Sequence, residues 1–323
     1  MFYWGRKGVL HIKQTIEELK SYQPERTSKP DHHDFWSQTL SEAKKKPLRA
    51  KLTDLNYPIK QITAYELTYH GFDETPIHAH YILPKEHNEK LPCLLFFHGY
   101  SMSKHSVSNY MQWLIQGYAV IAVDCRGQGK SGDFSSYTSD SLGTWVTKGI
   151  LDKEEYYYRK VYTDGVRAID FACSRPEIDP DRIGVIGGSM GGGITLAVAA
   201  LDDRPKLAIA DMPNMCDIPL AIEQKFEGSL TFVEKFLHQY PEHIELVYEN
   251  LTYFDNLNLS ESITCKTRIS QGLKDLICPP MPAFGVYNLI TAPKSMEIYP
   301  FTAHDMSMVE HVDKTIEFVN ENL

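Results

Sequence analysis

Six short apolar segments recur between residues 91 and 300, and longer, often helix-patterned stretches separate them. Their sequences are CLLFF, YAVIAVD, IGVIGG, LAIADM, TRISQG and MEIYP. Apolar strands that alternate with helices are typical of a mostly parallel sheet, because each crossover lays a helix on a face of the sheet. The clearest crossover helix is predicted over 154–174, where one face carries Val161, Gly165, Ala168, Ile169 and Ala172. The predicted fold class is therefore α/β, with helices on both faces of a mostly parallel central sheet.

We expect a single domain over residues 1–323, with two helical additions. Residues 1–50 are predicted to form an N-terminal helical extension, with helices over 11–22 and 32–46. The segments QITAYELTYHG and TPIHAHYILP alternate in polarity and predict an antiparallel pair of strands. Residues 214–260 interrupt the strand–helix alternation and predict a helical insertion, or cap, over the carboxyl edge of the sheet. The apolar residues of this insertion are Leu220, Ile222, Phe226, Phe232 and Phe236.

Composition excludes several classes of partner. The net charge of −9 argues against nucleic acid and anionic membranes as partners, since both require a positive surface. No run of eighteen apolar residues occurs, and the opening MFYWGRKGVL is too short and too broken for a secretory signal. The six cysteines are scattered without a C-x-x-C pair, and H-E-x-x-H is absent, so no metal site is predicted. We expect a reduced, cytoplasmic protein.

The strongest chemical signal is a serine among glycines, Gly187-Gly188-Ser189-Met190-Gly191. This G-x-S-x-G pattern follows an apolar strand and precedes a helix of small residues, which is the context of a nucleophile elbow. A phosphate-binding Walker loop would end in Gly-Lys-Ser/Thr, but no lysine occurs between Arg182 and Lys206. The dinucleotide motif G-x-G-x-x-G fits no register of these glycines. A tight strand–helix crossing with an incidental serine remains the alternative.

A serine nucleophile needs a base and an acid, and these are expected later in the order Ser, Asp, His. Asp275 follows the TRISQG strand and His304 follows the MEIYP strand, both just past the carboxyl edge of the sheet. The competing histidines are predicted to be surface residues: His238, His243 and His311. The rival acid Asp305 is adjacent to the base and is expected instead to make a loop or helix-cap contact.

The oxyanion hole is predicted from two backbone N–H groups. One belongs to Met190, directly after the nucleophile, and the other to Tyr100, which follows His98-Gly99 at the end of the CLLFF strand. The side chains of Tyr100 and Met190, with the insertion above them, are predicted to crowd the acyl pocket. Such a pocket favours acetyl over longer acyl groups. The alternative is an open cleft, lined by the apolar residues of the insertion, that accepts lipid-like esters.

The chain resembles the acetyl xylan esterase and cephalosporin C deacetylase group, carbohydrate esterase family 7, over nearly its whole length. The matching segments are FFHGY, DCRGQGKS, KGILDKEEYYYRKVYTDGVRA, GGSMGGGITLAVAAL, YFDNLN, GLKDLICPP and IYPFTAHD. The resemblance implies an α/β-hydrolase fold and deacetylation of small acetylated sugars and related acetyl esters without a cofactor. It also implies a ring-like homo-hexamer whose active sites face an inner cavity.

Position by position, the resemblance gives Ser189 as nucleophile, Asp275 as acid, His304 as base, and Tyr100 and Met190 as oxyanion donors. It also matches Arg126 and Gln128 to the family's R-G-Q motif, which we interpret as support for the floor of the site. Gly187 and Gly191 are expected from the turn itself, because the neighbours two residues from a serine in a strained strand–helix turn must lack bulk. Two departures stand out, because the family usually has Gln where Met190 stands and Glu where Asp305 stands.

Two other functions compete with the esterase interpretation. A prolyl-oligopeptidase-type serine peptidase shares the elbow and the order of the triad, but this chain lacks the long propeller that gates such enzymes. A non-catalytic binding protein on a hydrolase scaffold would require a broken site, whereas every expected catalytic position is filled here.

Overall fold

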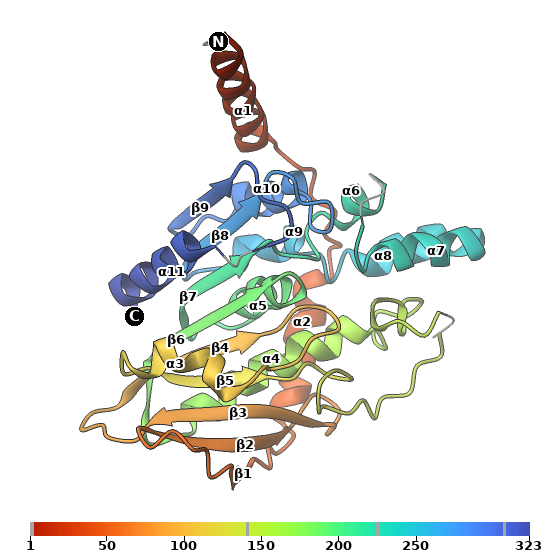
Figure 1. Cartoon of the computed structure of the whole chain (residues 1–323). Helices are drawn as coiled ribbons and strands as arrows, with labels where there is room; N and C mark the ends of the chain where they lie inside the picture. The colour runs from red at the N-terminus through yellow and green to blue at the C-terminus, as the bar shows by residue number, and fades with distance from the viewer. Residues whose placement is uncertain (1–2, 140–141, 224–226, 306–307) are drawn as a thin grey trace.

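The computed structural model describes residues 3–139, 142–223, 227–305 and 308–323, and it is built on a nine-stranded sheet in the order β1-β2-β3-β5-β4-β6-β7-β8-β9 (Figure 1). The strands are β1 (Lys51–Asp54), β2 (Ile62–His70), β3 (Pro76–Pro84), β4 (Leu91–Phe97), β5 (Ala119–Val123), β6 (Ile178–Gly188), β7 (Pro205–Asp211), β8 (Lys266–Gly272) and β9 (Lys294–Tyr299). Strands β4 to β9 run parallel to one another, while β1, β2, β3 and β5 are joined by antiparallel pairings. The predicted mostly parallel sheet and the predicted antiparallel pair β2–β3 are both confirmed.

Helices cover both faces of the sheet, because successive side chains of a strand point to opposite faces. On β4, Leu95 belongs to the core cluster that includes α4 (Tyr157–Cys173) and α5 (Met190–Leu201). The adjacent Leu94 belongs to a second cluster with η1 (Val107–Tyr110), α3 (Met111–Leu114) and α11 (Val309–Asn322). Figure 1 shows these two layers, with α4 and α5 behind the strands and α3 and α11 in front. The crossover helix predicted over 154–174 is α4.

The N-terminal region contains α1 (Tyr3–Ser21) and α2 (His32–Lys44). Helix α2 buries Phe35 and Trp36, and the Trp36 indole N–H donates to the carbonyl of Tyr253 at 2.8 Å. Helix α1 extends away from the body in Figure 1 and is tied at its end to α10 (Pro280–Leu289), where Asn288 donates to the Leu19 carbonyl at 3.1 Å. The first helix therefore begins earlier than residue 11, the position that the sequence indicated.

Between β7 and β8 the chain forms a series of short helices: α6 (Ile218–Glu223), α7 (Thr231–Gln239), η3 (Pro241–His243), α8 (Ile244–Leu251), α9 (Asn256–Leu259) and η4 (Ser260–Ser262). Phe236 and Ile222 of this segment are buried, Leu220 and Phe232 are half-buried, and Phe226 lies outside the described residues. A further short helix, η2 (Trp145–Thr147), lies in the connection between β5 and α4. Within the described ranges, no helix is both long and apolar enough to cross a membrane.

Candidate active site

Ser189 occupies a sharp turn between β6 and α5. Its backbone has φ +58° and ψ −121°, a conformation that L-residues rarely adopt. The strain is offset by backbone hydrogen bonds: the Ser189 N–H donates to the Asp211 carbonyl at 2.8 Å, and the Ser189 carbonyl accepts from Gly193 and Asn214, each at 3.0 Å. The turn therefore holds the serine at the carboxyl edge of the sheet, at the start of α5.

The two outer glycines of the motif are required by close backbone contacts. A Cβ on Gly191 would lie 2.0 Å from the Phe97 carbonyl oxygen on β4, and a Cβ on Gly187 would lie 2.4 Å from the Gly191 backbone. The inner Gly188 is different, since its nearest neighbours would be at 3.8 Å. The turn thus needs glycine two residues before and two residues after the serine, and tolerates other residues between them.

Asp275 and His304 are brought together from the loops that follow β8 and β9. His304 Nδ1 lies 2.7 Å from Asp275 Oδ2, and the Asp275 carboxylate is buried. Its other oxygen accepts the N–H groups of Ile277 at 2.8 Å and Cys278 at 2.9 Å. Because a carboxylate only accepts hydrogen bonds, His304 Nδ1 carries the proton, which leaves Nε2 of the neutral ring as an acceptor.

Gly272, the last residue of β8, allows these two loops to approach. A Cβ at Gly272 would lie 2.4 Å from the Thr302 carbonyl oxygen and 2.5 Å from that of Ala303. The Lys274 N–H donates to the same Thr302 carbonyl at 3.1 Å. The loop that carries the carboxylate is therefore hydrogen-bonded to the loop that carries the imidazole.

Gln128 connects the loop after β4 with the elbow. Its side-chain oxygen accepts the Ser101 N–H at 2.8 Å, and its amide nitrogen donates to Tyr157 Oη at 3.1 Å and to Met190 Sδ at 3.5 Å. Tyr100, next to Ser101, sets its ring edge-on to Trp145 with centroids 5.0 Å apart. Gln128 thus fixes the spacing between the two segments that carry the predicted oxyanion donors.

The expectation that the Met190 side chain crowds the acyl pocket is wrong. Met190 is completely buried, and its sulfur lies against Gln128, below the elbow. The residue after the nucleophile is the first residue of α5, and its side chain points into the core that the sheet and helices share. The sequence alone does not show whether the Met190 side chain points into the core or toward the cavity.

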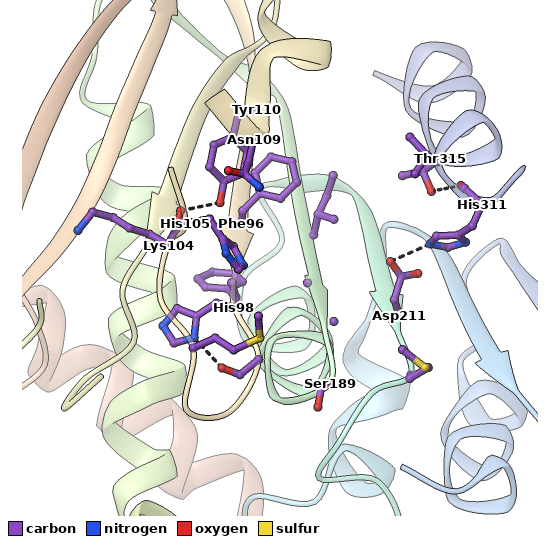
Figure 2. A pocket seen from close by; sticks show the side chains of 18 of the residues that line it. Phe96, His98, Lys104, His105, Asn109, Tyr110, Ser189, Asp211, His311 and Thr315 are labelled. Carbon is purple, nitrogen blue, oxygen red and sulfur yellow. Dashed lines mark hydrogen bonds and ion pairs between the residues drawn. The ribbon is translucent and has the colours of Figure 1, made fainter. Parts of the chain in front are cut away.

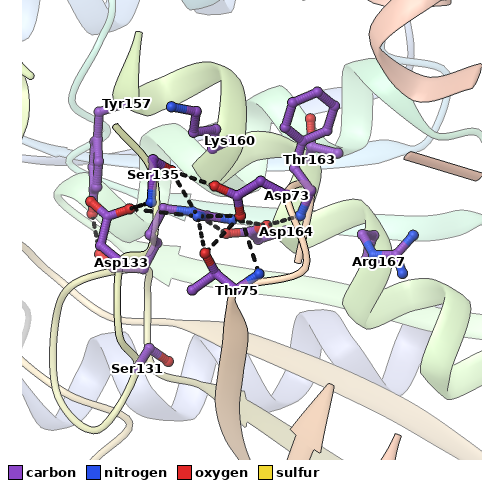
Figure 3. Close-up of polar contacts among 12 residues, drawn as sticks. Asp73, Thr75, Ser131, Asp133, Ser135, Tyr157, Lys160, Thr163, Asp164 and Arg167 are labelled. Atoms are coloured by element: carbon purple, nitrogen blue, oxygen red, sulfur yellow. Dashed lines mark hydrogen bonds and ion pairs between the residues drawn. The ribbon is translucent and has the colours of Figure 1, made fainter. Parts of the chain in front are cut away.

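Arg126 anchors the loop that carries Gln128 from within the protein. Three of its partners, Asp73, Thr75 and Asp164, lie close together in Figure 3. Its fully buried guanidinium donates to both carboxylate oxygens of Asp164 at 2.9 Å, and to Asp73 Oδ1 and Thr75 Oγ1 at 2.7 Å each. Burial alone would lower the pKa of Arg126, but the neighbouring Asp164 and Asp73 hold that pKa well above its ordinary value. The Arg126 carbonyl accepts the Tyr157 hydroxyl at 2.6 Å, which connects this ionic cluster to the Gln128 contacts.

Two cavities meet at Ser189 and His304. The α3–α11 cavity, about 660 Å³, lies over β4, β6 and β7 between α3 and α11, and its lining includes Phe96, Lys104, Asp211 and His311 (Figure 2). The Trp145 cavity, about 630 Å³, is lined by Tyr100, Trp145, Phe232 and Ile277 among others. Each volume is in the range that holds an organic ligand rather than a single ion or water. In the described part of the chain, no three His, Cys, Asp or Glu side chains gather as metal ligands.

The prediction that His311 is a surface residue is wrong. His311 is buried, with Nε2 3.1 Å from Asp211 Oδ2 and Nδ1 3.1 Å from Tyr299 Oη. The signal that was missed is helical spacing, because His311 shares an inward face with Thr315 and Val319 of α11. His238 is exposed, as predicted, and His243 is half-buried, while Asp305 is exposed at the rim of the α3–α11 cavity.

A mostly parallel sheet that presents a strained serine between β6 and α5, with a histidine–aspartate pair beyond β8 and β9, defines an α/β-hydrolase. The model of the family described as acetyl xylan esterase (AXE1) matches residues 10–322. The chain therefore belongs to the acetyl xylan esterase family and is a carboxylic ester hydrolase.

Similar proteins agree with this assignment. The acetyl xylan esterase from Paenibacillus sp. R4 has a TM-score of 0.93 at 38% identity, with 95% of this chain and 99% of that one covered. Acetyl xylan esterase 1 from Thermoanaerobacterium sp. JW/SL YS485 has a TM-score of 0.90 at 29% identity, with 94% and 98% covered. Acetyl esterase Axe7A from Xylanibacter ruminicola is 29% identical over 306 residues, which are 91% of this chain and 67% of that protein.

Peptidases are more distant. Dipeptidyl aminopeptidase BIII from Pseudoxanthomonas mexicana is 28% identical over 109 residues, only 33% of this chain and 14% of that protein.

Proposed function

We propose that this protein is a serine acetylesterase that removes acetyl groups from small acetylated carbohydrates and related acetyl esters, cephalosporin C among them. The observation that carries the proposal is the 2.7 Å pairing of His304 with the buried Asp275 beside a cavity that Ser189 also lines. Family membership supplies the class of ester, and this geometry supplies the groups that would carry out the reaction.

The first step is attack by Ser189 on the acetyl carbonyl. His304 accepts the serine proton through Nε2, while Asp275 fixes the ring tautomer and stabilises the imidazolium that forms. The side chain of Ser189 contacts the thiol of Cys278, a group whose pKa burial raises, so the thiol stays protonated and leaves the base role to His304. Attack requires the Ser189 hydroxyl to turn from that contact toward His304 Nε2, and catalytic hydrogen bonds often tighten only when substrate is present.

The negative charge of the tetrahedral intermediate is bound by the backbone N–H groups of Tyr100 and Met190. The N-terminal end of α5 adds the positive end of its dipole at the same point. The alcohol then leaves with the proton from His304, and water releases acetate from the serine ester by the same steps in reverse. A backbone donor is independent of the side chain, so methionine in place of the family's usual glutamine is compatible with this role.

Selectivity for short acyl groups rests on the Trp145 cavity rather than on Met190. Tyr100 and Trp145 pack edge-on and support each other, and Phe232 and Ile277 line the same cavity. Where the acyl chain meets these packed side chains, extra methylenes cost about 1–3 kcal/mol in all, which corresponds to roughly a ten- to hundredfold loss of rate. We therefore expect kcat/KM to fall steeply from nitrophenyl acetate to butyrate and octanoate.

We further propose that the protein assembles as a homo-hexamer in the cytoplasm. Large apolar side chains are exposed on loops near the site, notably Phe301 and Leu276, which are 74% and 55% exposed, and such residues suit burial against other copies of the chain. All six cysteines are free thiols, which suits a reducing compartment.

A substrate panel tests the proposed function. Purified protein is assayed for release of acetate from acetylated xylo-oligosaccharides and cephalosporin C, for hydrolysis of nitrophenyl esters of rising chain length, and for cleavage of aminoacyl anilides. Ser189→Ala serves as the blank. We expect rapid hydrolysis of the acetyl esters alone; equal turnover of octanoate would contradict acetyl selectivity. Preferential cleavage of the anilides would instead favour a peptidase.

A further inference from the structure

Asp211, the last residue of β7, contacts the elbow and the neighbouring strand at once. Its carbonyl accepts the Ser189 N–H at 2.8 Å, and its carboxylate oxygen Oδ1 accepts the Ser270 hydroxyl of β8 at 2.6 Å. The next residue, Met212, donates its N–H to the Ser270 carbonyl at 2.8 Å. The end of β7 is therefore fixed to the residue before α5 on one side and to β8 on the other.

The second carboxylate oxygen of Asp211 is held by the C-terminal helix. His311 Nε2 on α11 lies 3.1 Å from Asp211 Oδ2, and the carboxylate can only accept, so Nε2 carries a proton. The other nitrogen of the neutral ring, Nδ1, then accepts from the hydroxyl of Tyr299 at 3.1 Å. Tyr299 is the last residue of β9, so one imidazole connects β7 with β9. Figure 2 shows the contact of this imidazole with Asp211.

Each of the three joined strand ends either contacts or leads to one group of the proposed triad. The Asp211 carbonyl holds Ser189, the loop after Ser270 leads to Asp275, and the loop after Tyr299 leads to His304. An apolar pair of similar volume would cost less to desolvate than Asp211 and His311. A largely buried polar pair where these three strand ends meet fixes a geometry that apolar packing specifies less sharply.

We propose that Asp211 and His311 are positioning residues, which together set the relative placement of the nucleophile, the acid and the base. They act through the backbone of Ser189 and through the ends of β8 and β9. The proposal rests on the proposed function, because it takes Ser189 as the nucleophile.

The experiment measures the rate at which a fluorophosphonate labels Ser189, followed by intact mass spectrometry. This readout reports the activated serine whatever the natural ester is. Displacement of a reacting group by about 1 Å costs about a hundredfold in rate, so Asp211→Ala and His311→Ala are expected to label roughly ten- to a hundredfold more slowly than the unaltered protein. His311 lines the α3–α11 cavity, so added imidazole can enter the space that His311→Ala leaves and should restore labelling in a saturable way.

The conservative variant distinguishes position from charge. In Asp211→Asn the amide oxygen still accepts from the Ser270 hydroxyl. The His311 ring changes tautomer, so that its Nδ1–H donates to the Tyr299 hydroxyl. Its Nε2 then accepts from the new amide nitrogen. With all hydrogen bonds restored, labelling should remain within about threefold of the unaltered rate. If Asp211→Asn is instead as slow as Asp211→Ala, the carboxylate charge and not position matters, and the proposal is overturned.

Two controls complete the design. Tyr118→Phe removes a hydrogen bond of 2.9 Å between Tyr118 Oη and Asn320 of α11 without touching Asp211, and should label at the unaltered rate. Ser189→Ala is the blank. Failure of the unaltered protein to label would refute the serine mechanism itself, whereas normal labelling of both Asp211→Ala and His311→Ala would refute only the positioning role. Thermal unfolding and near-ultraviolet circular dichroism test whether each variant is folded. If folded His311→Ala is labelled slowly and imidazole does not restore its labelling rate, that result also counts against the proposal.

Discussion

The contrast between two neighbouring glycines gives the sharpest mutational test of the elbow. In Gly191→Ala the new Cβ would lie 2.0 Å from the Phe97 carbonyl oxygen and 2.9 Å from that of His98. Both atoms are backbone, at the end of a central strand, so no side chain can move aside. Reaching van der Waals contact at 3.4 Å requires a displacement of about 1.4 Å between α5 and β4. Overpacking of this kind costs about 1–3 kcal/mol or more in stability, and a misplacement of that size costs at least about a hundredfold in kcat/KM.

Gly188→Ala is the matched control, since its Cβ would meet nothing closer than 3.8 Å. The two variants are compared by urea unfolding, followed by tryptophan fluorescence, and by kcat/KM on nitrophenyl acetate. We expect the free energy of unfolding of Gly188→Ala to stay within about 1 kcal/mol of that of the unaltered protein, and its kcat/KM to stay within severalfold. Gly191→Ala should lose both stability and activity. A stable, fully active Gly191→Ala would refute the account of why the motif requires its outer glycines.

The proposed acid, the buried His98 and the proposed assembly each give a further prediction. Asp275→Asn should lower kcat on the order of 10⁴-fold by disturbing the tautomer of His304, whereas Asp305→Asn should change kcat little; the reverse order in steady-state kinetics would mean that the acid is assigned wrongly. Burial lowers the pKa of His98, whose Nε2 accepts the Cys125 N–H at 2.9 Å, so the unfolded chain takes up a proton that the folded protein does not. The free energy of unfolding should therefore fall as the pH drops below about 6.5, by up to about 1.4 kcal/mol per pH unit from this group. Urea titrations at a series of pH values should show a shallower fall for His98→Gln. An equal fall in both proteins would contradict the role given to His98. Light scattering should report about six times the chain mass of 36.9 kDa, and a monomer at micromolar concentration would exclude the hexamer.

Most of the sheet was predictable because its strands are short, apolar and buried on both faces, which leaves a strong signal in one sequence. The edge strand β1 was not predicted. It has four residues, KLTD, and one side of it is open to solvent, so its side chains are largely exposed and follow no apolar alternation. Its place is decided by antiparallel pairing with β2, the next strand along the chain, and the polarity pattern of KLTD itself does not encode that pairing.

The placement of the candidate site residues was predictable to the extent that each of them follows a recognisable strand end. Ser189, Asp275 and His304 each come just after an apolar run, and parallel strands bring such positions to one edge. What local pattern could not give was the direction of a side chain, as for Met190, or the partner of a helix residue, as for His311. Both depend on how α5 and α11 dock on the sheet.

The central claim is that acetyl transfer proceeds through Ser189, and the acyl-enzyme tests it most directly. The protein is mixed with excess nitrophenyl acetate, quenched with acid within the first turnover, and examined by intact mass and peptide mapping. The mechanism predicts a mass gain of one acetyl group on the peptide that contains Ser189. The acetyl group should be lost more slowly in Asp275→Asn, and no acetylated peptide should form in Ser189→Ala. Turnover at the normal rate with an acetyl group on another residue, or undiminished turnover in Ser189→Ala, would contradict the account.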